Sequence, residues 1–221
     1  MTLSTSSTSS KKTKRTYGGL SEAQRVNERR ERFLEAGLEV FGSLGMRGAT
    51  VRKLCKEAGL TERYFYESFT GTEDLYCEVF RAQVNATGQR FMSLLPDLPV
   101  ALEDRIRTCL ELYFTSMRND RVVRVMYIES LVGSDQVQNI LRQNVASLSS
   151  LALMMLRADN PDLDVTEDFG KAMGTAINGA MSALAVQWML SDYAMEQHVL
   201  VESGTLMVLG TMQELKARYS K

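Results

Sequence analysis

The chain has 221 residues, a formal net charge of −1, 44% hydrophobic residues and 24% charged residues. This composition is ordinary for a globular protein and argues against one whose whole surface binds nucleic acid. No run approaches the ~18 apolar residues of a membrane span, and the Ser/Thr-rich N-terminus lacks the apolar stretch of a secretory signal. We therefore expect a cytoplasmic chain with no membrane partner.

Residues 1–20 have the composition of a disordered arm, with four basic side chains and no acidic one. These side chains are Lys11, Lys12, Lys14 and Arg15, and they are able to lie along phosphates or in a minor groove. A solvated tail that only aids solubility fits the same residues, so both interpretations stay open. Residues 22–80 carry nine basic and 11 acidic groups, so contacts to nucleic acid there have to come from individually placed side chains.

The pattern over residues 29–48 predicts an amphipathic helix, within a helical region that begins near Ser21. Its apolar face consists of Phe33, Ala36, Gly37, Val40, Phe41 and Leu44. The helix is expected to end at Gly45-Met46-Arg47-Gly48.

Residues 50–69 carry the pattern of a helix-turn-helix. Thr50 and Thr61 are suited to cap the starts of two short helices, because a threonine hydroxyl accepts a hydrogen bond from a free backbone amide. Gly59 stands where a helix ends in the left-handed conformation that glycine adopts without strain. The inner faces are Val51, Leu54, Cys55 and Ala58 in the first helix and Phe65 and Phe69 in the second. In such a motif the first helix braces on the DNA backbone and the second enters the major groove.

The motif lies within a longer set of residues at characteristic spacing. The set is Phe33-Leu34-Glu35-Ala36-Gly37, Phe41, Gly45, Ala49-Thr50-Val51, Ala58-Gly59-Leu60-Thr61, Phe65-Tyr66, Phe69 and Glu73-Asp74-Leu75. Over residues 27–86 the chain thus resembles the DNA-binding domain of the TetR family of bacterial repressors. The remaining chain resembles the family only in size and helical character. Two positions depart: Arg63-Tyr64 replace a small pair, and Thr72 replaces a lysine that contacts phosphate, so the operator sequence stays open.

From this motif we predict which side chains meet DNA. Thr50, Arg52 and Lys53 are placed to hold phosphates, and Arg63 is the best candidate to read a guanine. The full predicted set is Arg47, Thr50, Arg52, Lys53, Thr61, Arg63, Tyr64, Tyr66 and Thr72. The expected partner is double-stranded DNA with a palindromic operator, because one motif reads few base pairs and half-sites pair by two-fold symmetry.

No window after the motif shows sustained strand alternation, so the predicted fold class is all-α. Further helices are expected at 72–95, 101–118, 121–132, 136–157, 166–191 and 195–219, with breaks at Pro96-Asp97-Leu98-Pro99 and Asn160-Pro161-Asp162. We predict an N-terminal three-helix helix-turn-helix domain followed by a larger helical ligand-binding and dimerisation domain. The predicted divisions are a basic arm at 1–20, a DNA-binding domain at 21–86 and an effector-binding and dimerisation domain at 87–221.

Small residues recur every four positions in the helix at 166–191: Gly170, Gly174, Asn178 and Ser182. Such spacing lets helices approach closely. The resemblance implies that the last two long helices form a homodimer, with Gly170, Gly174, Leu200, Met207 and Gly210 as predicted contacts. Internal packing within a monomer is the alternative.

The middle helices are rich in aromatic residues and methionines, and methionine suits sites that adapt to varied apolar shapes. The resemblance implies an effector pocket here for a small molecule of unknown identity. The predicted ligand residues are Phe91, Tyr113, Met117, Tyr127, Met154, Asn178 and Trp188. Plain core packing is the alternative for any one of them.

The residues needed for catalysis or metal binding are not grouped in the sequence. The single histidine, His198, lies in the last predicted helix, and Cys55, Cys77 and Cys109 have no ligand spacing with it. We therefore expect no enzyme, no metal and no cofactor. The chain is predicted to be a dimeric, ligand-responsive transcriptional regulator, a repressor released from its operator by a small, largely apolar ligand. Control by cysteine oxidation, or no effector at all, is the alternative.

Overall fold

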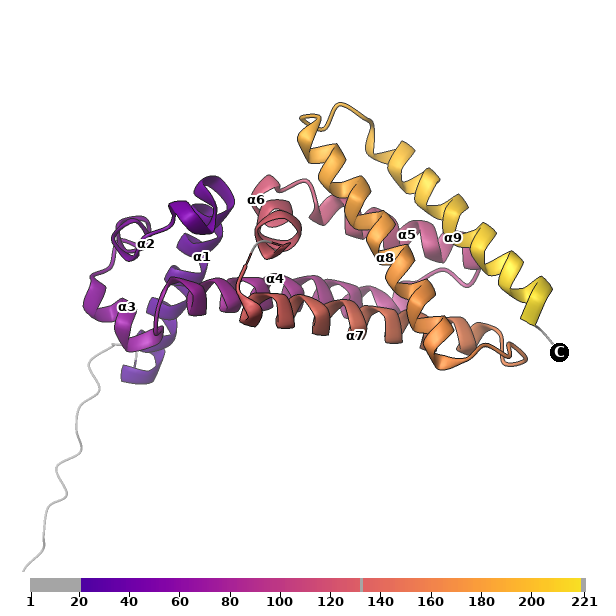
Figure 1. Cartoon of the computed structure of the whole chain (residues 1–221), viewed down its shortest axis with the longest axis horizontal. Helices are drawn as coiled ribbons and strands as arrows, with labels where there is room; N and C mark the ends of the chain where they lie inside the picture. The colour runs from indigo at the N-terminus through magenta and orange to yellow at the C-terminus, as the bar shows by residue number, and fades with distance from the viewer. Residues whose placement is uncertain (1–20, 132, 220–221) are drawn as a thin grey trace, which may run out of the picture.

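The computed structural model describes residues 21–131 and 133–219, which form helices and connecting loops without a strand among them (Figure 1). The N-terminal part contains α1 (Glu22–Gly48), α2 (Val51–Ala58), α3 (Glu62–Ser68) and α4 (Thr72–Leu94). The rest contains the 3-10 helix η1 (Leu95–Asp97), α5 (Leu102–Ser116), α6 (Asp120–Val123), the π-helix η2 (Arg124–Ile128), the 3-10 helix η3 (Glu129–Leu131), α7 (Asp135–Asp159), α8 (Glu167–Leu190) and α9 (Gln197–Tyr219). The all-α prediction is confirmed. The predicted basic arm at 1–20 lies outside the described residues.

Local signals explain where α1 begins and ends. Ser21 and Gln24 form a capping box, in which the Ser21 hydroxyl accepts from the Gln24 amide and the Gln24 side chain accepts from the Ser21 amide. Near the other end, Gly45 has φ +69°, which breaks the helix before its last turn. The turn after Gly45 is thereby aimed differently from the body of α1.

The helix-turn-helix forms as its caps predict, with one difference. The Thr50 hydroxyl accepts from the Lys53 amide at 3.3 Å, and Gly59 ends α2 in the left-handed conformation. Thr61 has the extended backbone of an N-cap, but its hydroxyl makes no capping hydrogen bond. The α3 helix is therefore fixed mainly by its buried face.

Aromatic rings packed edge to face hold the N-terminal helices together. Phe33 of α1 meets the rings of Phe65 and Phe69 at centroid distances of 5.4 and 6.0 Å, and Phe41 meets Tyr76 at 5.2 Å. All five side chains are buried. Val125 of η2 and Val137 of α7 belong to the same buried cluster, so this core is shared with the larger part of the chain.

The larger part is built from several smaller buried clusters. One contains Phe80, Met117, Val123, Met126 and Met189, and another contains Leu110, Phe114, Met181, Trp188 and Leu200. In Figure 1, α7 runs beside α4, while α8 and α9 form the outer side away from the helix-turn-helix. The α4 helix continues through residue 86 without a break, and the division there stays a prediction.

Two glycines of α8 pack against α7 of the same chain. A Cβ on Gly174 would lie 2.8 Å from the Cα of Ser149, and a Cβ on Gly170 would collide with the Leu153 side chain. Both neighbours belong to α7 of the same chain. Leu200 is likewise buried in its own chain. Gly170, Gly174 and Leu200 are thus covered by their own chain, and the small residues of α8 allow a close approach to α7. The dimer contacts stay a prediction.

Candidate nucleic-acid interface and ligand site

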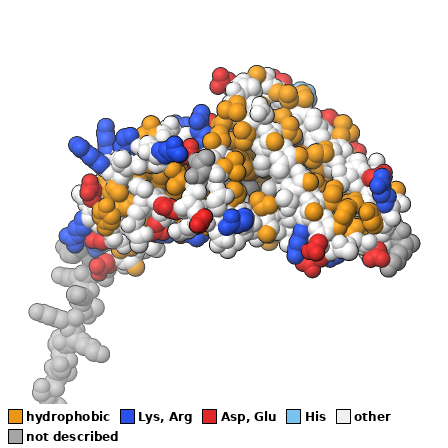
Figure 2. Space-filling view, viewed as in Figure 1, with side chains coloured by type: hydrophobic (Ala, Val, Ile, Leu, Met, Phe, Trp, Pro, Cys, Tyr) orange, Lys and Arg blue, Asp and Glu red, His pale blue; other side chains and the backbone are white. Residues whose placement is uncertain are grey.

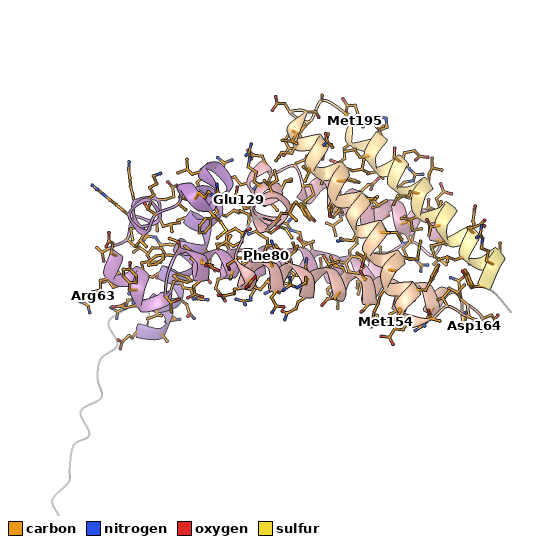
Figure 3. The ribbon with its side chains drawn as sticks, viewed as in Figure 1. Arg63, Phe80, Glu129, Met154, Asp164 and Met195 are labelled. Carbon is orange, nitrogen blue, oxygen red and sulfur yellow. The ribbon has the colours of Figure 1, made fainter. Side chains whose placement is uncertain are left out.

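The outer face of α2 and α3 presents polar side chains to solvent. Arg47, Thr50, Arg52, Lys53, Thr61, Arg63 and Tyr66 of the predicted DNA-binding set are all exposed. The Arg63 side chain is 84% exposed, and Figure 3 shows it at the far end of the molecule. In Figure 2, Lys and Arg side chains protrude at the end formed by α1–α3. The two motif helices thus offer a basic and aromatic edge of the kind that enters a major groove.

Arg63 is held by a neighbour on its own helix. Its Nε donates to Glu67 Oε1 at 3.1 Å, one turn further along α3. Arg29 of α1 lies 3.8 Å from the other Glu67 oxygen. An exposed pair of this kind is weak, so exchange of Glu67 for a guanine edge costs Arg63 little.

Tyr64 and Tyr66 differ in their surroundings. Tyr64 is half-buried against the N-terminal core, and the Arg29 guanidinium lies 4.4 Å from the centre of its ring. Tyr66 is 60% exposed and touches only the edge of Phe65 among aromatic neighbours. Tyr66 is therefore the tyrosine with a free ring face, while Tyr64 helps to fix α3 on α1.

The other predicted phosphate contacts lie at helix starts. Lys53 donates from Nζ to the Gly48 carbonyl oxygen at 2.8 Å, which keeps its ammonium at the junction of α1 and α2. Thr72 is the first residue of α4 and is half-buried. Asp74 accepts from the Thr70 amide at 2.9 Å, so an acidic group already occupies part of that helix start. The amides of α2 are consequently the better placed for phosphate.

A set of polar contacts joins the DNA-reading helices to the segment α6–η3. The Tyr76 hydroxyl of α4 donates to the Val125 carbonyl oxygen at 2.5 Å inside the core. The Met46 amide, just after the break in α1, donates to the Glu129 carboxylate at 2.8 Å. Glu129 stands between the two parts of the molecule in Figure 3.

The α6 end of the segment is joined to α1 as well. Arg121 pairs with Glu39, with Nη2 donating to Oε1 at 2.8 Å. Gly42 makes this approach feasible, because a Cβ there would lie 2.7 Å from the Arg121 Cα. Sequence reasoning missed these contacts. Glycine at 42 was a signal for a close approach, but the sequence does not name its partner.

Three hydroxyl groups meet inside the larger part of the chain. The hydroxyls of Tyr113 on α5 and Tyr127 on η2 lie 3.2 Å apart. Burial, with the neighbouring tyrosine next in importance for Tyr113, raises the pKa of both phenols, so both are neutral at physiological pH. Ser182 of α8 lies close to both hydroxyls and donates to the Asn178 carbonyl oxygen at 2.8 Å. We call Tyr113, Tyr127 and Ser182 the hydroxyl cluster.

The structure brings together some of the predicted ligand residues and separates others. Met117 is buried in the cluster of side chains against which Tyr113 and Tyr127 pack. Trp188 is buried too, but its Nε1 donates to the Met195 carbonyl oxygen at 2.7 Å, so its polar atom is occupied. Phe91 and Asn178 are half-buried, and Met154 is 61% exposed near the far end of α7 (Figure 3). The ligand set stays a prediction, with Met154 apart from the rest.

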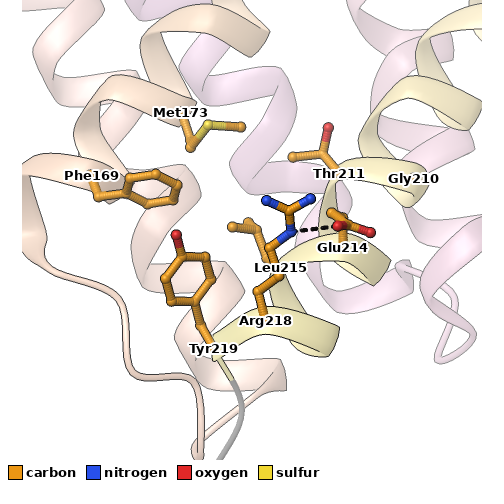
Figure 4. Close-up of a pocket in the computed structure, with 8 residues that line it drawn as sticks. All are labelled: Phe169, Met173, Gly210, Thr211, Glu214, Leu215, Arg218 and Tyr219. Atoms are coloured by element: carbon orange, nitrogen blue, oxygen red, sulfur yellow. Dashed lines mark hydrogen bonds and ion pairs between the residues drawn. The ribbon is translucent and has the colours of Figure 1, made fainter.

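Two open cavities lie on the surface rather than at the hydroxyl cluster. One, of about 480 Å³, lies between α8 and α9 and is lined by Phe169, Tyr219, the Arg218–Glu214 ion pair and Gly210 of the predicted dimer contacts (Figure 4). The other, of about 360 Å³, lies between α7 and α8. Met207, the last predicted dimer residue, is half-buried on α9. A Cβ added at Gly210 would have no atom within 4 Å, so this side of α9 is uncovered.

The three cysteines lack the surroundings of a redox switch. Cys55 and Cys77 are buried and Cys109 is partly buried, and burial raises the pKa of all three thiols. A reactive cysteine needs its pKa lowered, so control by oxidation gains no support from this geometry.

Within the described ranges, no helix is long and apolar enough to cross a membrane. Nor does that part of the chain bring three or more His, Cys, Asp or Glu side chains together as a set able to hold a metal ion.

Comparisons with known proteins agree with this geometry. Residues 33–79 match the model of bacterial regulatory proteins of the tetR family. No curated protein sequence matches the chain significantly. Among solved structures, a transcriptional regulator from Pseudomonas aeruginosa PAO1 is similar with a TM-score of 0.73 and 16% identity, over 87% of this chain and 94% of that one.

Two regulators named FadR have the same fold. The fatty acid degradation regulator FadR from Bacillus halodurans has a TM-score of 0.68 and 17% identity, over 82% of this chain and 94% of that one. FadR from Bacillus subtilis, solved with stearoyl-CoA, has a TM-score of 0.63 and 14% identity, over 79% and 95%.

The fold and the exposed motif define a helix-turn-helix DNA-binding protein with a larger all-helical domain behind the motif. Residues 33–79 thus carry the DNA-binding motif of bacterial regulatory proteins of the tetR family, and the described chain has the fold of solved transcriptional regulators.

Proposed function

We propose that the protein is a cytoplasmic, dimeric repressor that a small, largely apolar ligand releases from a palindromic operator. Arg63 and Tyr66 would read bases, and Thr50, Arg52 and Lys53 would hold phosphates, because these side chains are exposed on the motif helices. The α2 amides would add to phosphate binding.

The observation that carries the ligand response is the segment α6–η3. It contacts the DNA-reading part through Glu39, Met46 and Tyr76, and its Tyr127 reaches the interior of the larger domain. A ligand that shifts this segment changes the position of both α1 and α4. A change in the separation of two motifs weakens binding to half-sites spaced about 34 Å apart.

The proposed dimer uses the uncovered sides of α8 and α9. The α8 face consists of small exposed residues at helical spacing, and the α9 face is apolar: Ala172, Ala176, Gly179 and Ala183 on α8, with Val199, Leu206 and Gly210 on α9. Figure 2 shows hydrophobic side chains gathered over this part of the molecule. A second copy would cover a face that solvent now touches, with the C2 symmetry that a palindromic operator requires.

The FadR likeness supports an apolar ligand only in general terms. The Bacillus subtilis FadR structure is a complex with stearoyl-CoA, which carries a long hydrocarbon chain. Identity of 14% shows a shared fold, so the likeness favours an apolar ligand class here without naming a molecule.

The test begins with the DNA fragment that the purified protein protects from nuclease. On that fragment, Arg63→Ala should relax preference at one base pair, at a cost of about 1–3 kcal/mol. Lys53→Ala should instead weaken binding to all sequences and reduce the salt dependence by about one phosphate contact. Equal behaviour of the two variants across an operator panel would contradict the assignment.

Ligand control is tested separately, with Tyr76→Phe. This variant keeps the ring but removes the hydrogen bond to Val125, so it should bind ligand and operator yet lose part of their mutual effect. Ligand should reduce operator affinity of the parent protein roughly 5–150-fold, and the reduction should be smaller in the variant. Tyr193→Phe is the control, because its hydroxyl also meets a backbone carbonyl, that of Met117, but within the larger domain.

A further inference from the structure

The hydroxyl cluster is an unusual feature in an otherwise apolar interior. Tyr113, Tyr127 and Ser182 come from three different elements, α5, η2 and α8, and their polar groups converge at one point. The side chains around them include Met117, Met126 and Met189, which adapt their shape readily. The place is therefore polar at one point and deformable around it.

The cluster retains hydrogen-bonding capacity. Each hydroxyl has one donor hydrogen and two acceptor lone pairs, so three hydroxyls offer nine places for hydrogen bonds. The bond from Tyr113 to Tyr127 and the bond from Ser182 to the Asn178 carbonyl oxygen fill only part of them. A guest with a donor or acceptor group is able to join this network without breaking all of it.

The fully buried side chains of the described residues offer no charged group to pair with a charged guest. The buried polar side chains of the described residues are Ser130, Ser149, Asn160 and Thr205, none of them a cation or a carboxylate. The tyrosines of the cluster stay neutral because burial raises the pKa of both. A charge brought here without a partner bears a large desolvation penalty.

We propose that the hydroxyl cluster binds the polar group of the effector, and that the effector is an uncharged molecule with a hydroxyl or carbonyl group on an apolar body. This inference rests on the proposed ligand response. It assigns the recognition to Tyr113, Tyr127 and Ser182, and it excludes ionised carboxylates, amines and phosphates from the interior site.

The same cluster places the guest beside the contacts to the DNA-reading helices. Tyr127 lies in the π-helix η2, two residues after Val125, which accepts from Tyr76, and two before Glu129, which accepts from Met46. A π-helix has a wider turn than an α-helix and marks functional sites frequently. A ligand that separates the Tyr113 and Tyr127 hydroxyls displaces this π-helical turn. The Tyr76–Val125 and Met46–Glu129 contacts then move with it.

The experiment compares four probes that share an eight-carbon chain: 1-octanol, octanoate, octylamine and octanoyl-CoA. Binding to the full-length protein is measured at pH 7.5 by the fluorescence of Trp188, the one tryptophan of the chain, and by calorimetry. Saturable binding of 1-octanol, at least about tenfold tighter than octanoate and octylamine, is expected because the charged probes have no partner inside. Octanoate, octylamine or octanoyl-CoA binding as tightly as 1-octanol would overturn the proposal, as would no binding of 1-octanol.

Variants then locate the binding. Tyr127→Phe and Ser182→Ala each remove one hydroxyl with little change of shape, and each should weaken 1-octanol about 2- to 10-fold, the equivalent of one neutral hydrogen bond. Tyr193→Phe, which removes a hydroxyl outside the cluster, should leave 1-octanol binding unchanged. Circular dichroism and operator binding establish that each variant is folded. Unchanged 1-octanol binding by both folded cluster variants would overturn the assignment.

Operator titration separates this inference from the proposed function. If 1-octanol binds through the cluster but leaves operator affinity unchanged, the site stands and the proposed ligand response fails. If octanoate or octanoyl-CoA releases the operator while 1-octanol does not, the ligand response stands and the uncharged-effector inference is wrong.

Discussion

The two parts of the molecule are packed in different ways. The N-terminal core is made of aromatic rings that meet edge to face around Phe33, whereas the larger domain divides its interior among separate clusters that contain methionines. Eleven of the 13 methionines follow residue 86. Rings fix neighbours through their geometry, and methionine side chains accommodate several shapes. A DNA-reading part thus keeps one shape while the part behind it is able to change.

The largest expected effect tests this contrast directly. Phe65→Ala should reduce the free energy of unfolding by about 3–5 kcal/mol, because it empties the centre of the aromatic core. Met189→Leu, a change of similar volume in the larger domain, should cost less than about 1.5 kcal/mol. Urea unfolding of both variants gives the comparison. Similar losses for the two would remove the distinction between a fixed and an adaptable core.

A smaller effect shows where the larger domain is itself rigid. Gly174→Ala should cost about 1–3 kcal/mol, because the added Cβ would lie 2.8 Å from the Ser149 backbone of α7. Gly88→Ala is the matched control, since Gly88 also lies inside a helix but a Cβ added there would have no atom within 4 Å. That control should stabilise by roughly 0.5–1 kcal/mol. In thermal unfolding, the melting temperature should fall for Gly174→Ala and rise for Gly88→Ala. A lower melting temperature for Gly88→Ala would contradict this account.

The smallest effect concerns the two motif helices. Thr50→Ala should cost about 1 kcal/mol because the Thr50 hydroxyl caps α2. Thr61→Ala should reduce the free energy of unfolding by no more than roughly a few tenths of a kcal/mol, because the Thr61 hydroxyl makes no capping hydrogen bond. Chemical denaturation without DNA measures both. A larger loss for Thr61→Ala would mean that α3 depends on its cap more than on Phe65 and Phe69.

The helices could be predicted from the sequence because their boundaries depend on local signals. Thr50, Gly59 and Pro161 each act on the backbone next to them, and most helices begin and end within a few residues of the predicted positions. The exception is the helix predicted at 121–132, which is divided into α6, the π-helix η2 and the 3-10 helix η3. The buried faces of α2 and α3 followed from spacing in the same way, since Leu54, Ala58 and Phe65 are all buried. Exposure of Arg63 and Lys53 on the motif follows from the same periodicity.

Contacts between distant segments could not be predicted in this way. Tyr76 and Val125 are 49 positions apart, and Met46 and Glu129 are 83 apart, with no shared pattern in the sequence. The small residues of α8 correctly indicated a close helix approach, but spacing does not say whether the neighbour is α7 or a second chain. The π-helical turn that contains Tyr127 carries no sequence signal that we recognise.

Because α7 packs tightly against α8 and also reaches the N-terminal core, its length fixes the distance between the two. Val137, near the start of α7, lies in the core of the DNA-reading part, while Ser149 and Leu153 further along are clamped against the glycines of α8. At 1.5 Å per residue, the 25 residues of α7 span about 37 Å. In the proposed dimer, the length of α7 therefore sets the distance of each helix-turn-helix from the symmetry axis. Removal of one helical turn would shorten α7 by about 5 Å, and the preferred distance between the two DNA half-sites should decrease with it.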